Sequence, residues 1–340
     1  MKKHLQQIDV LKGIAIISVI ALHSVTKQEL VQSYAIYHIW QAVPLFMILM
    51  GVNLGLGLRA ERQQLSQLYT KVYFTKKATR ILVPFTLVFV ASIVLGLLWL
   101  QLYNRNMLEF TAFNWIGVLP VSGKGNYFIT LILQSIILLP IIGYGFAIRP
   151  ILTTLFLVLV EAAFLLFSKK YNLFEGEDLA YIYAAALPRY FSALALGLWL
   201  AKSINKGFKP SVLLIFLLLG LLSILYLYLT VYHDLHIPIV YESWATQNMF
   251  AFGYAALLIL LIILLLPASS DNYILRLIAN IGQASYHIFL VQVLYFGLTI
   301  DHSNLLLNLA ICLLLGELFY KAENQMSKKY LSFSQSNISS

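Results

Sequence analysis

Apolar residues follow one another along most of the chain in runs of about twenty, and short polar segments separate the runs. A helix needs about 20 mostly apolar residues to cross the hydrocarbon core of a bilayer, so these runs predict membrane-spanning helices. We therefore expect an all-α, polytopic integral membrane protein with about ten transmembrane helices. The predicted spans are 8–26, 34–57, 81–103, 126–147, 150–168, 179–201, 211–232, 245–267, 273–299 and 303–321.

The polar segments between the runs are too short to form a soluble domain. We predict a single transmembrane domain over residues 1–325 and a polar, disordered cytoplasmic tail over residues 326–340. Two lysines precede the first run, as in a signal peptide. However, Asp9 and Lys12 interrupt that run and no small-residue cleavage site follows, so the run is counted as the first span.

Composition agrees with this reading. Of the 340 residues, 60% are hydrophobic and 11% are charged, whereas a soluble domain carries about 25% charged residues. The outer surface is therefore expected to face the lipid bilayer. Cys312 is the single cysteine, which excludes a disulfide within the chain, and its apolar neighbours favour packing over nucleophilic catalysis.

The 23 Lys and Arg residues are distributed unevenly among the loops. With a cytoplasmic N-terminus, sixteen fall in cytoplasmic loops and tails, five fall on the opposite side, and Lys12 and Arg189 fall inside spans. The positive-inside rule then places both termini in the cytoplasm. The same rule accounts for the net charge of +9 without a nucleic-acid partner. We expect a multi-pass protein of a cell membrane, the bacterial plasma membrane in particular.

Two loops differ from the others. The segment 59–80 is basic and precedes Pro84, so it either lies along the inner leaflet or simply follows the charge rule. On the opposite side, the segment 104–126 contains Trp115 and the turn-rich sequence SGKGN. This composition favours an interfacial or re-entrant element over a cavity.

Ionisable residues inside spans are the candidate functional residues, because each costs about 2.5–3.5 kcal/mol at the bilayer centre. In the first span, Lys12 and His23 are eleven residues apart, so their side chains point in directions that differ by roughly 20° around the helix axis. The direction of Asp9 differs from that of His23 by about 40°. The rise between Lys12 and His23 is about 16 Å. The sequence thus predicts a stripe with a cation near the cytoplasmic entrance and an imidazole farther in.

Histidine can exchange a proton near neutral pH, so His23 is a candidate general base, although a lone histidine can also serve only to join helices. Arg189 either orients an anionic group or pairs with Glu161, and function is slightly favoured. For three further residues a structural role is at least as well supported: Glu161, Gln134 and His287.

Several segments resemble a known family. IDVLKGIAIISVIALH is similar to the opening of the membrane-bound acyltransferase 3 family, whose first helix carries a basic residue followed eleven positions later by histidine, as Lys12 and His23 do here. Lysine replaces the usual arginine, Met50 replaces a serine, and Gln292 stands where histidine is common. The later segments that resemble the family, in the same order, are PLFMILMGVNLGL, KKATRILVP, NYFITLILQSIILLP, LPRYFSALALG and IGQASYHIFLVQ.

The resemblance implies an O-acyltransferase that moves an acyl group, usually acetyl, from cytoplasmic acyl-CoA to a hydroxyl of a cell-envelope carbohydrate or lipid-linked glycan. It implies acetyl-CoA as the donor and no metal. Many members also carry a soluble hydrolase-like domain, so we expect a stand-alone enzyme or one that relies on a separate partner protein for onward transfer.

The resemblance also implies roles for named residues. His23 would be the general base, Asp9 would position Lys12 or the donor, and Tyr286 or Arg189 would polarise the thioester carbonyl. A covalent acyl-histidine is the less parsimonious variant. The residues expected to bind the phosphates of coenzyme A are Lys12, Lys77 and Arg80.

Two other classes remain open. Intramembrane charges also mark the pathways of transporters, so a transporter or flippase of an envelope glycan precursor is the alternative; paired broken helices in two related halves, which would favour it, are not visible in the sequence. A glycan polymerase or ligase is a third class, but it would typically have longer external loops than those predicted here.

Overall fold

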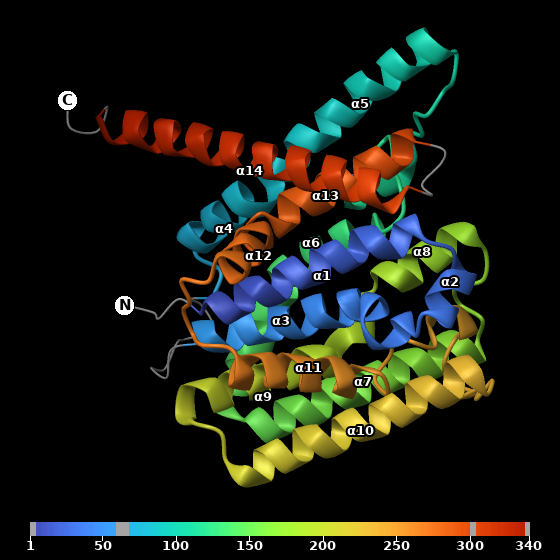
Figure 1. Cartoon of the computed structure of the whole chain (residues 1–340), viewed down its shortest axis with the longest axis vertical. Coiled ribbons are helices and arrows are strands. Elements are labelled where there is room, and N and C mark those ends of the chain that lie inside the picture. The colour runs from blue at the N-terminus through green and yellow to red at the C-terminus, as the bar shows by residue number, and fades with distance from the viewer. Residues whose placement is uncertain (1–4, 59–67, 300–303, 337–340) are drawn as a thin grey trace.

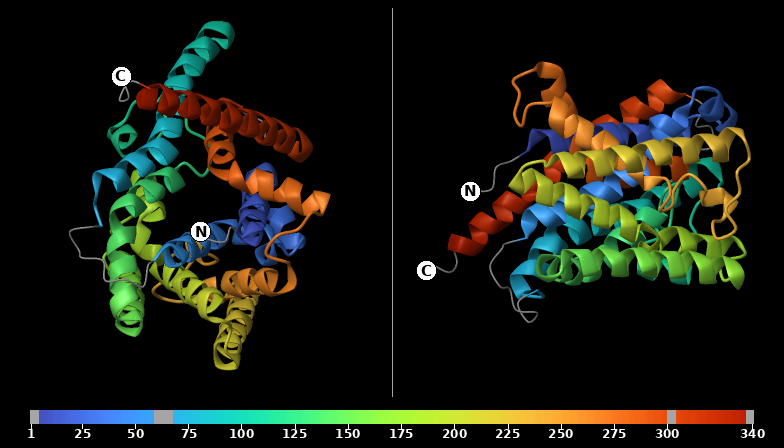
Figure 2. Two further views of the ribbon diagram at one scale, coloured as in Figure 1. Left: turned by 90° about the vertical axis from the view of Figure 1, so that its left-hand side faces the viewer. Right: turned by 90° about the horizontal axis from the view of Figure 1, so that it is seen from below.

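The computed structural model describes residues 5–58, 68–299 and 304–336, with backbone only at 177–178 and 327–336. The described residues form a bundle of roughly aligned helices, in which α5 and α10 lie at opposite edges (Figures 1 and 2). The start of α1 and the end of α14 lie on the same side, which is called the N-terminal side below (Figure 1). The main helices are α1 (Gln6–Ser24), α3 (Ala42–Gly57), α4 (Lys71–Lys77), α5 (Val83–Tyr103), α6 (Tyr127–Ile148), α7 (Pro150–Lys170), α8 (Glu177–Ala185), α9 (Phe191–Lys206), α10 (Pro210–Tyr232), α11 (Phe252–Leu265), α12 (Tyr273–Gln283), α13 (Ser285–Leu298) and α14 (Leu305–Ser336).

The polytopic all-α prediction is confirmed. Among the described residues, seven helices are long and apolar enough to cross a membrane, and two bent helix pairs raise the number to nine. One further apolar helix, α11, is only 14 residues long. The count of ten spans and the cytoplasmic location of the termini stay predictions.

The span predicted at 245–267 begins later in the structure, at Phe252. The side chain of Asn248 donates to the carbonyl oxygen of Ala245 at 2.7 Å and accepts from the backbone N–H of Phe250 at 3.0 Å. Because an asparagine that bonds its own backbone competes with the helical ladder, the preceding turns stay irregular. Apolar content alone does not reveal this competition.

Two spans are broken rather than continuous. The first bends by 43° between α8 and the segment that starts at Leu187, and the second bends by 65° between α12 and α13. At the first break, the side-chain amide of Gln134 donates to the carbonyl of Ala185 at 2.8 Å and accepts from the N–H of Leu187 at 3.1 Å. Gln134 therefore satisfies backbone groups that the break leaves unpaired, which is the structural role expected for it.

Glycines bring the central helices into close contact. Gly51 of α3 and Gly197 of α9 face each other so closely that a β-carbon on either would overlap the backbone of the other helix. Small residues at a crossing let backbones approach, which is how helices pack where lipid offers no hydrophobic driving force. The same arrangement joins α1 to α12, where Gly282 lies against the backbone of Asp9. Helix α1 is thereby fixed in the middle of the bundle.

The C-terminal residues differ from the prediction. α14 continues as far as Ser336, whereas the sequence predicted disorder from residue 326. This stretch contains neither proline nor glycine, so nothing in it ends a helix that has already begun.

In the first part of α14, Cys312 is fully buried, as expected for a packing residue. In the basic segment 59–80, Arg59 and Arg62 lie outside the described residues.

Candidate active site

One cavity of about 1230 Å³ penetrates the bundle. α1, α3, α4, α6 and α13 all contribute to its wall, together with the segment that precedes α6. Pockets for ordinary small ligands measure about 300–1,000 Å³, so this volume suits a large ligand or two ligands at once. From α1 the lining residues include Ile8, Asp9, Lys12, Val19 and His23. The structure therefore places the predicted stripe of α1 along the wall of one cavity.

His23 lies in the last turn of α1, on the side away from the N-terminus. The edge of its imidazole contacts the ring of Phe296 on α13, with ring centroids 6.0 Å apart. The Nε2 atom faces Gly125, where a β-carbon built on the glycine would lie 3.2 Å away. The imidazole thus packs against an aromatic ring at the cavity wall.

Lys12 lies nearer the N-terminal side of the same cavity. Its ammonium group forms an ion pair with Asp9 at 3.0 Å, and the other carboxylate oxygen of Asp9 accepts a hydrogen bond from Gln283 at 3.3 Å. The side chain of Lys12 is 26% exposed and that of Asp9 is 8% exposed. Both Asp9 and Lys12 line the cavity, and the ion pair with the buried carboxylate holds the ammonium group at the cavity wall.

Further cations lie at the N-terminal side of the cavity: Lys76, Lys77 and Arg80. Arg80 belongs to a turn of π-helix, Ala78–Leu82, that connects α4 to α5 just ahead of Pro84. π-helical turns are frequent at functional sites because they redirect side chains away from the regular helix faces. Lys77 lies over the ring of Tyr73, 5.7 Å from its centroid. Together with Lys12, these cations form the basic mouth of the cavity.

Tyr286 also lines the cavity, at the start of α13. Its hydroxyl donates to the carbonyl of Ile81, in the same π-helical turn as Arg80, at 3.1 Å. Tyr286 precedes Phe296, the residue that contacts His23, by ten helical positions, or about 15 Å. The structure thus brings Tyr286 together with the basic mouth.

The cavity lining, as far as the structure describes it, does not include Arg189. It is 1% exposed, and its guanidinium group donates to the carbonyls of Tyr183 at 3.3 Å and Gln247 at 3.1 Å. The same group lies 4.3 Å and 4.2 Å from the ring centroids of Tyr183 and Trp244. Trp244 packs in turn against Tyr127, which does line the cavity. Arg189 therefore reaches the cavity only through aromatic neighbours.

The other two polar residues with an expected structural role are buried in packed regions. Glu161 accepts a hydrogen bond from the backbone N–H of Ser192 at 2.6 Å. His287 is 6% exposed, lies 3.6 Å from a carboxylate oxygen of Glu323, and contacts the rings of Phe319 and Tyr320. Neither Glu161 nor His287 lines the cavity.

Asn53 and Gly125 are among the cavity-wall residues that sequence reasoning missed. Asn53 of α3 faces the cavity, and an amide inside an otherwise apolar helix was a signal that could have identified it. Gly125 was noted only as part of a turn-rich segment. Its position beside His23 depends on contacts between segments more than 100 residues apart, which no local pattern shows.

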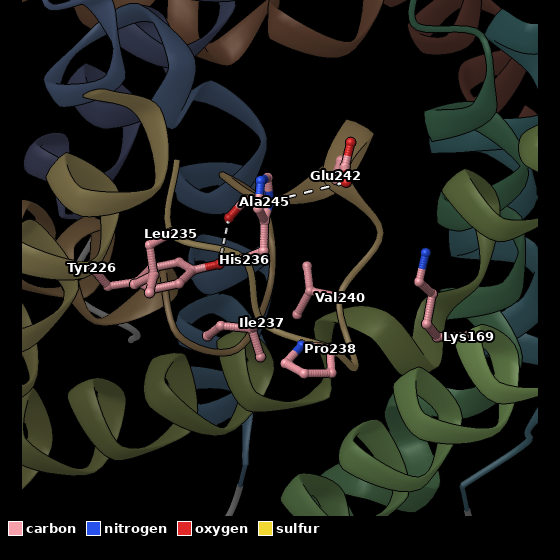
Figure 3. A pocket seen from close by; sticks show the side chains of 9 residues that line it. All are labelled: Lys169, Tyr226, Leu235, His236, Ile237, Pro238, Val240, Glu242 and Ala245. Carbon is pink, nitrogen blue, oxygen red and sulfur yellow. Dashed lines mark hydrogen bonds and ion pairs between the residues drawn. The ribbon is translucent and has the colours of Figure 1, made fainter. Parts of the chain in front are cut away.

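A second, smaller pocket lies between the end of α7, the side chain of Tyr226 on α10 and the loop that follows α10 (Figure 3). Its volume is about 140 Å³, and Lys169 faces Tyr226, His236 and Glu242 across it. The hydroxyl of Tyr226 donates to the carbonyl of Ala245 at 2.8 Å. This volume is too small for a coenzyme.

In residues 5–58, 68–299 and 304–336, no three His, Cys, Asp or Glu side chains converge as a metal site.

Comparison with the curated proteins and with the solved structures finds no match. A family model described as an acyltransferase domain matches residues 5–316, which include α1 with its Lys12 and His23 and all of the cavity lining except Tyr320. The match covers most of the 340 residues. The chain therefore belongs to the acyltransferase 3 family of membrane-bound acyltransferases.

Proposed function

We propose that the protein transfers an acetyl group from cytoplasmic acetyl-CoA to a hydroxyl of a cell-envelope carbohydrate, with His23 as the general base. The observation that carries this proposal is the shared cavity: Lys12 and His23, about 16 Å apart along α1, both line it. An elongated, anionic thioester matches a cavity with cations at one end and an imidazole at the other.

The basic mouth supports binding of the donor. Lys12, Lys77 and Arg80 present positive charge where the phosphates of coenzyme A would bind by charge-assisted hydrogen bonds. The pantetheine arm then extends along α1 toward His23, past apolar residues such as Val19 and Phe289. An apolar wall limits hydrolysis of the thioester because it excludes water.

The chemistry requires one base and no net change in protons. His23 accepts the proton of the acceptor hydroxyl while the oxygen of that hydroxyl attacks the thioester carbonyl carbon. The new C–O bond forms as the C–S bond breaks, and the coenzyme A thiolate then takes the proton back from the imidazolium. General acid–base catalysis of this kind accelerates a reaction by about 10²–10⁴-fold.

Tyr286 and Arg189 act as positioning residues in this scheme. The hydrogen bond from Tyr286 to Ile81 holds the π-helical turn that carries Arg80. Arg189 fixes Trp244, which packs against Tyr127 on the cavity wall. Polarisation of the thioester carbonyl by either side chain stays a prediction from the family resemblance.

The proposal is tested by comparing cells that express the protein with cells that lack it. The mass of the envelope glycans, measured after release, is expected to increase by acetyl units in the expressing cells. Purified protein in detergent is expected to bind acetyl-CoA. Unchanged glycan mass together with no binding of acetyl-CoA would refute the proposed function.

The transporter alternative is not favoured, although transporters also use broken helices. The two breaks, at Ala186 and Ala284, both lie in the second half of the chain and so do not occupy corresponding positions of two related halves. The family match also favours acyl transfer. A transporter has no reason to bind acetyl-CoA, so the binding measurement separates the two functions.

A further inference from the structure

Gly125 occupies a distinctive place at the His23 end of the cavity. It belongs to the segment 122–126, which precedes α6 and lines the cavity through this glycine. Its φ of +90° lies in the left-handed region, where glycine is favoured. The side chains on either side, Lys124 and Asn126, differ in exposure: Lys124 is exposed, whereas Asn126 is buried.

Contacts on both sides fix this segment in place. Toward α13, the N–H of Gly123 donates to the carbonyl of Val293 at 2.9 Å, and Gln292 donates to the carbonyl of Lys124 at 3.1 Å. Toward the preceding loop, Asn126 accepts a hydrogen bond from the N–H of Leu119 at 3.3 Å. The backbone at Gly125 therefore cannot withdraw from His23 without breaking several hydrogen bonds.

The absence of a side chain at Gly125 keeps open the space beside the imidazole. A β-carbon built there would lie 3.2 Å from Nε2 of His23 and 3.7 Å from the ring of Phe289. The first of these distances is shorter than ordinary van der Waals contact, so any side chain would occupy the position that a hydroxyl must take to give its proton to Nε2.

We propose that Gly125 determines access of the acceptor, with the hydroxyl of the carbohydrate binding between Gly125 and Nε2 of His23. This inference rests on the proposed function. The space is assigned to the acceptor because the cations that suit the donor lie at the other end of the cavity, at Lys12, Lys77 and Arg80. The exposed residues Ser122 and Lys124 place the same segment at the surface from which an acceptor approaches.

The test compares Gly125→Ala and Gly125→Asn with two control variants at glycines that also have a positive φ. Gly117→Ala lies in the same loop with φ of +116°, but its β-carbon would meet Leu133 and not His23. Gly176→Ala has φ of +101° and nothing within 4 Å. Each variant is expressed in cells, envelope-glycan acetylation is measured by mass spectrometry, and binding of acetyl-CoA is measured on the purified proteins.

We expect Gly125→Ala to lower glycan acetylation at least tenfold and Gly125→Asn to lower it further, with acetyl-CoA affinity within about twofold of wild type. For Gly117→Ala and Gly176→Ala, we expect glycan acetylation per folded molecule to equal that of wild type. The inference is overturned if Gly125→Ala acetylates as well as Gly117→Ala, or if its acetyl-CoA binding falls together with transfer. A wild-type protein that acetylates no glycan would instead refute the proposed function, so the two failures are distinguishable.

Discussion

Two regions of the molecule hold positive charge inside the helix bundle, and they hold it differently. Arg189 is 1% exposed, and backbone carbonyls and aromatic rings surround its guanidinium group. Lys12 is 26% exposed, and its ammonium group is paired with Asp9, which lines the same cavity. The comparison teaches that the free-energy cost of burying a charged side chain does not by itself identify a functional residue. Contact with a cavity that admits a ligand is the more informative property.

His23 and His287 give the largest test of this distinction. His23→Ala is expected to lower the rate of acetyl transfer by about 10²–10⁴-fold, because it removes the proposed general base from the cavity wall. His287→Gln is the matched control, since His287 is packed against Glu323 and does not line the cavity. We expect it to lower thermal stability and leave the rate per folded molecule near wild type. Equal rates for the two variants would refute the distinction.

A smaller effect is expected at Arg189. Arg189→Lys keeps the charge, but a single ammonium group cannot reach the carbonyls of both Tyr183 and Gln247 or stack on Trp244 as the planar guanidinium does. We expect a loss of about 2 kcal/mol in the free energy of unfolding, because buried acceptors are left unsatisfied. Denaturation in detergent measures this loss. An acetyl-CoA affinity that falls more than tenfold in a fully folded variant would show that Arg189 contacts the donor.

The smallest effect is expected at Lys12. Lys12→Gln removes one of several cations at the basic mouth, so the affinity for acetyl-CoA should fall about tenfold, or about 1.4 kcal/mol, with little change in kcat. Titration of the purified variant with acetyl-CoA measures the change. Lys206→Gln, at the end of α9 and outside the cavity lining, is the control. Unchanged affinity in Lys12→Gln would remove this residue from the donor site.

Much of the fold could be predicted from sequence, because helix length and apolar content are local properties. The first span was predicted at 8–26 and is helical at Gln6–Ser24, and the span predicted at 211–232 is helical at Pro210–Tyr232. The breaks near Ala186 and Ala284 were missed. Pro188 follows the first break and the polar residues Gln283 and Ser285 flank the second, but the predicted spans ran through both. The side chain that stabilises the first break, Gln134, comes from a different helix.

The candidate site was partly predictable for the same reason. Lys12 and His23 lie on one regular helix, so their shared face followed from 3.6 residues per turn. The location of Tyr286 beside Ile81, and of Arg189 among aromatic rings, depends on packing between distant segments. Residue type alone could not separate an arginine that faces a ligand from one that joins three segments of the protein. The roles of these residues stay predictions.

Separation of the basic mouth from His23 has an energetic consequence under the proposed function. The phosphates of the donor remain on the N-terminal side, and only the acetyl group, which is uncharged, passes to an acceptor on the other side. Moving one elementary charge across a membrane potential costs about 2.3 kcal/mol per 100 mV, and a neutral group incurs no such electrical work. Delivery of acetyl groups then requires neither an ion gradient nor ATP, because the thioester itself supplies the driving force.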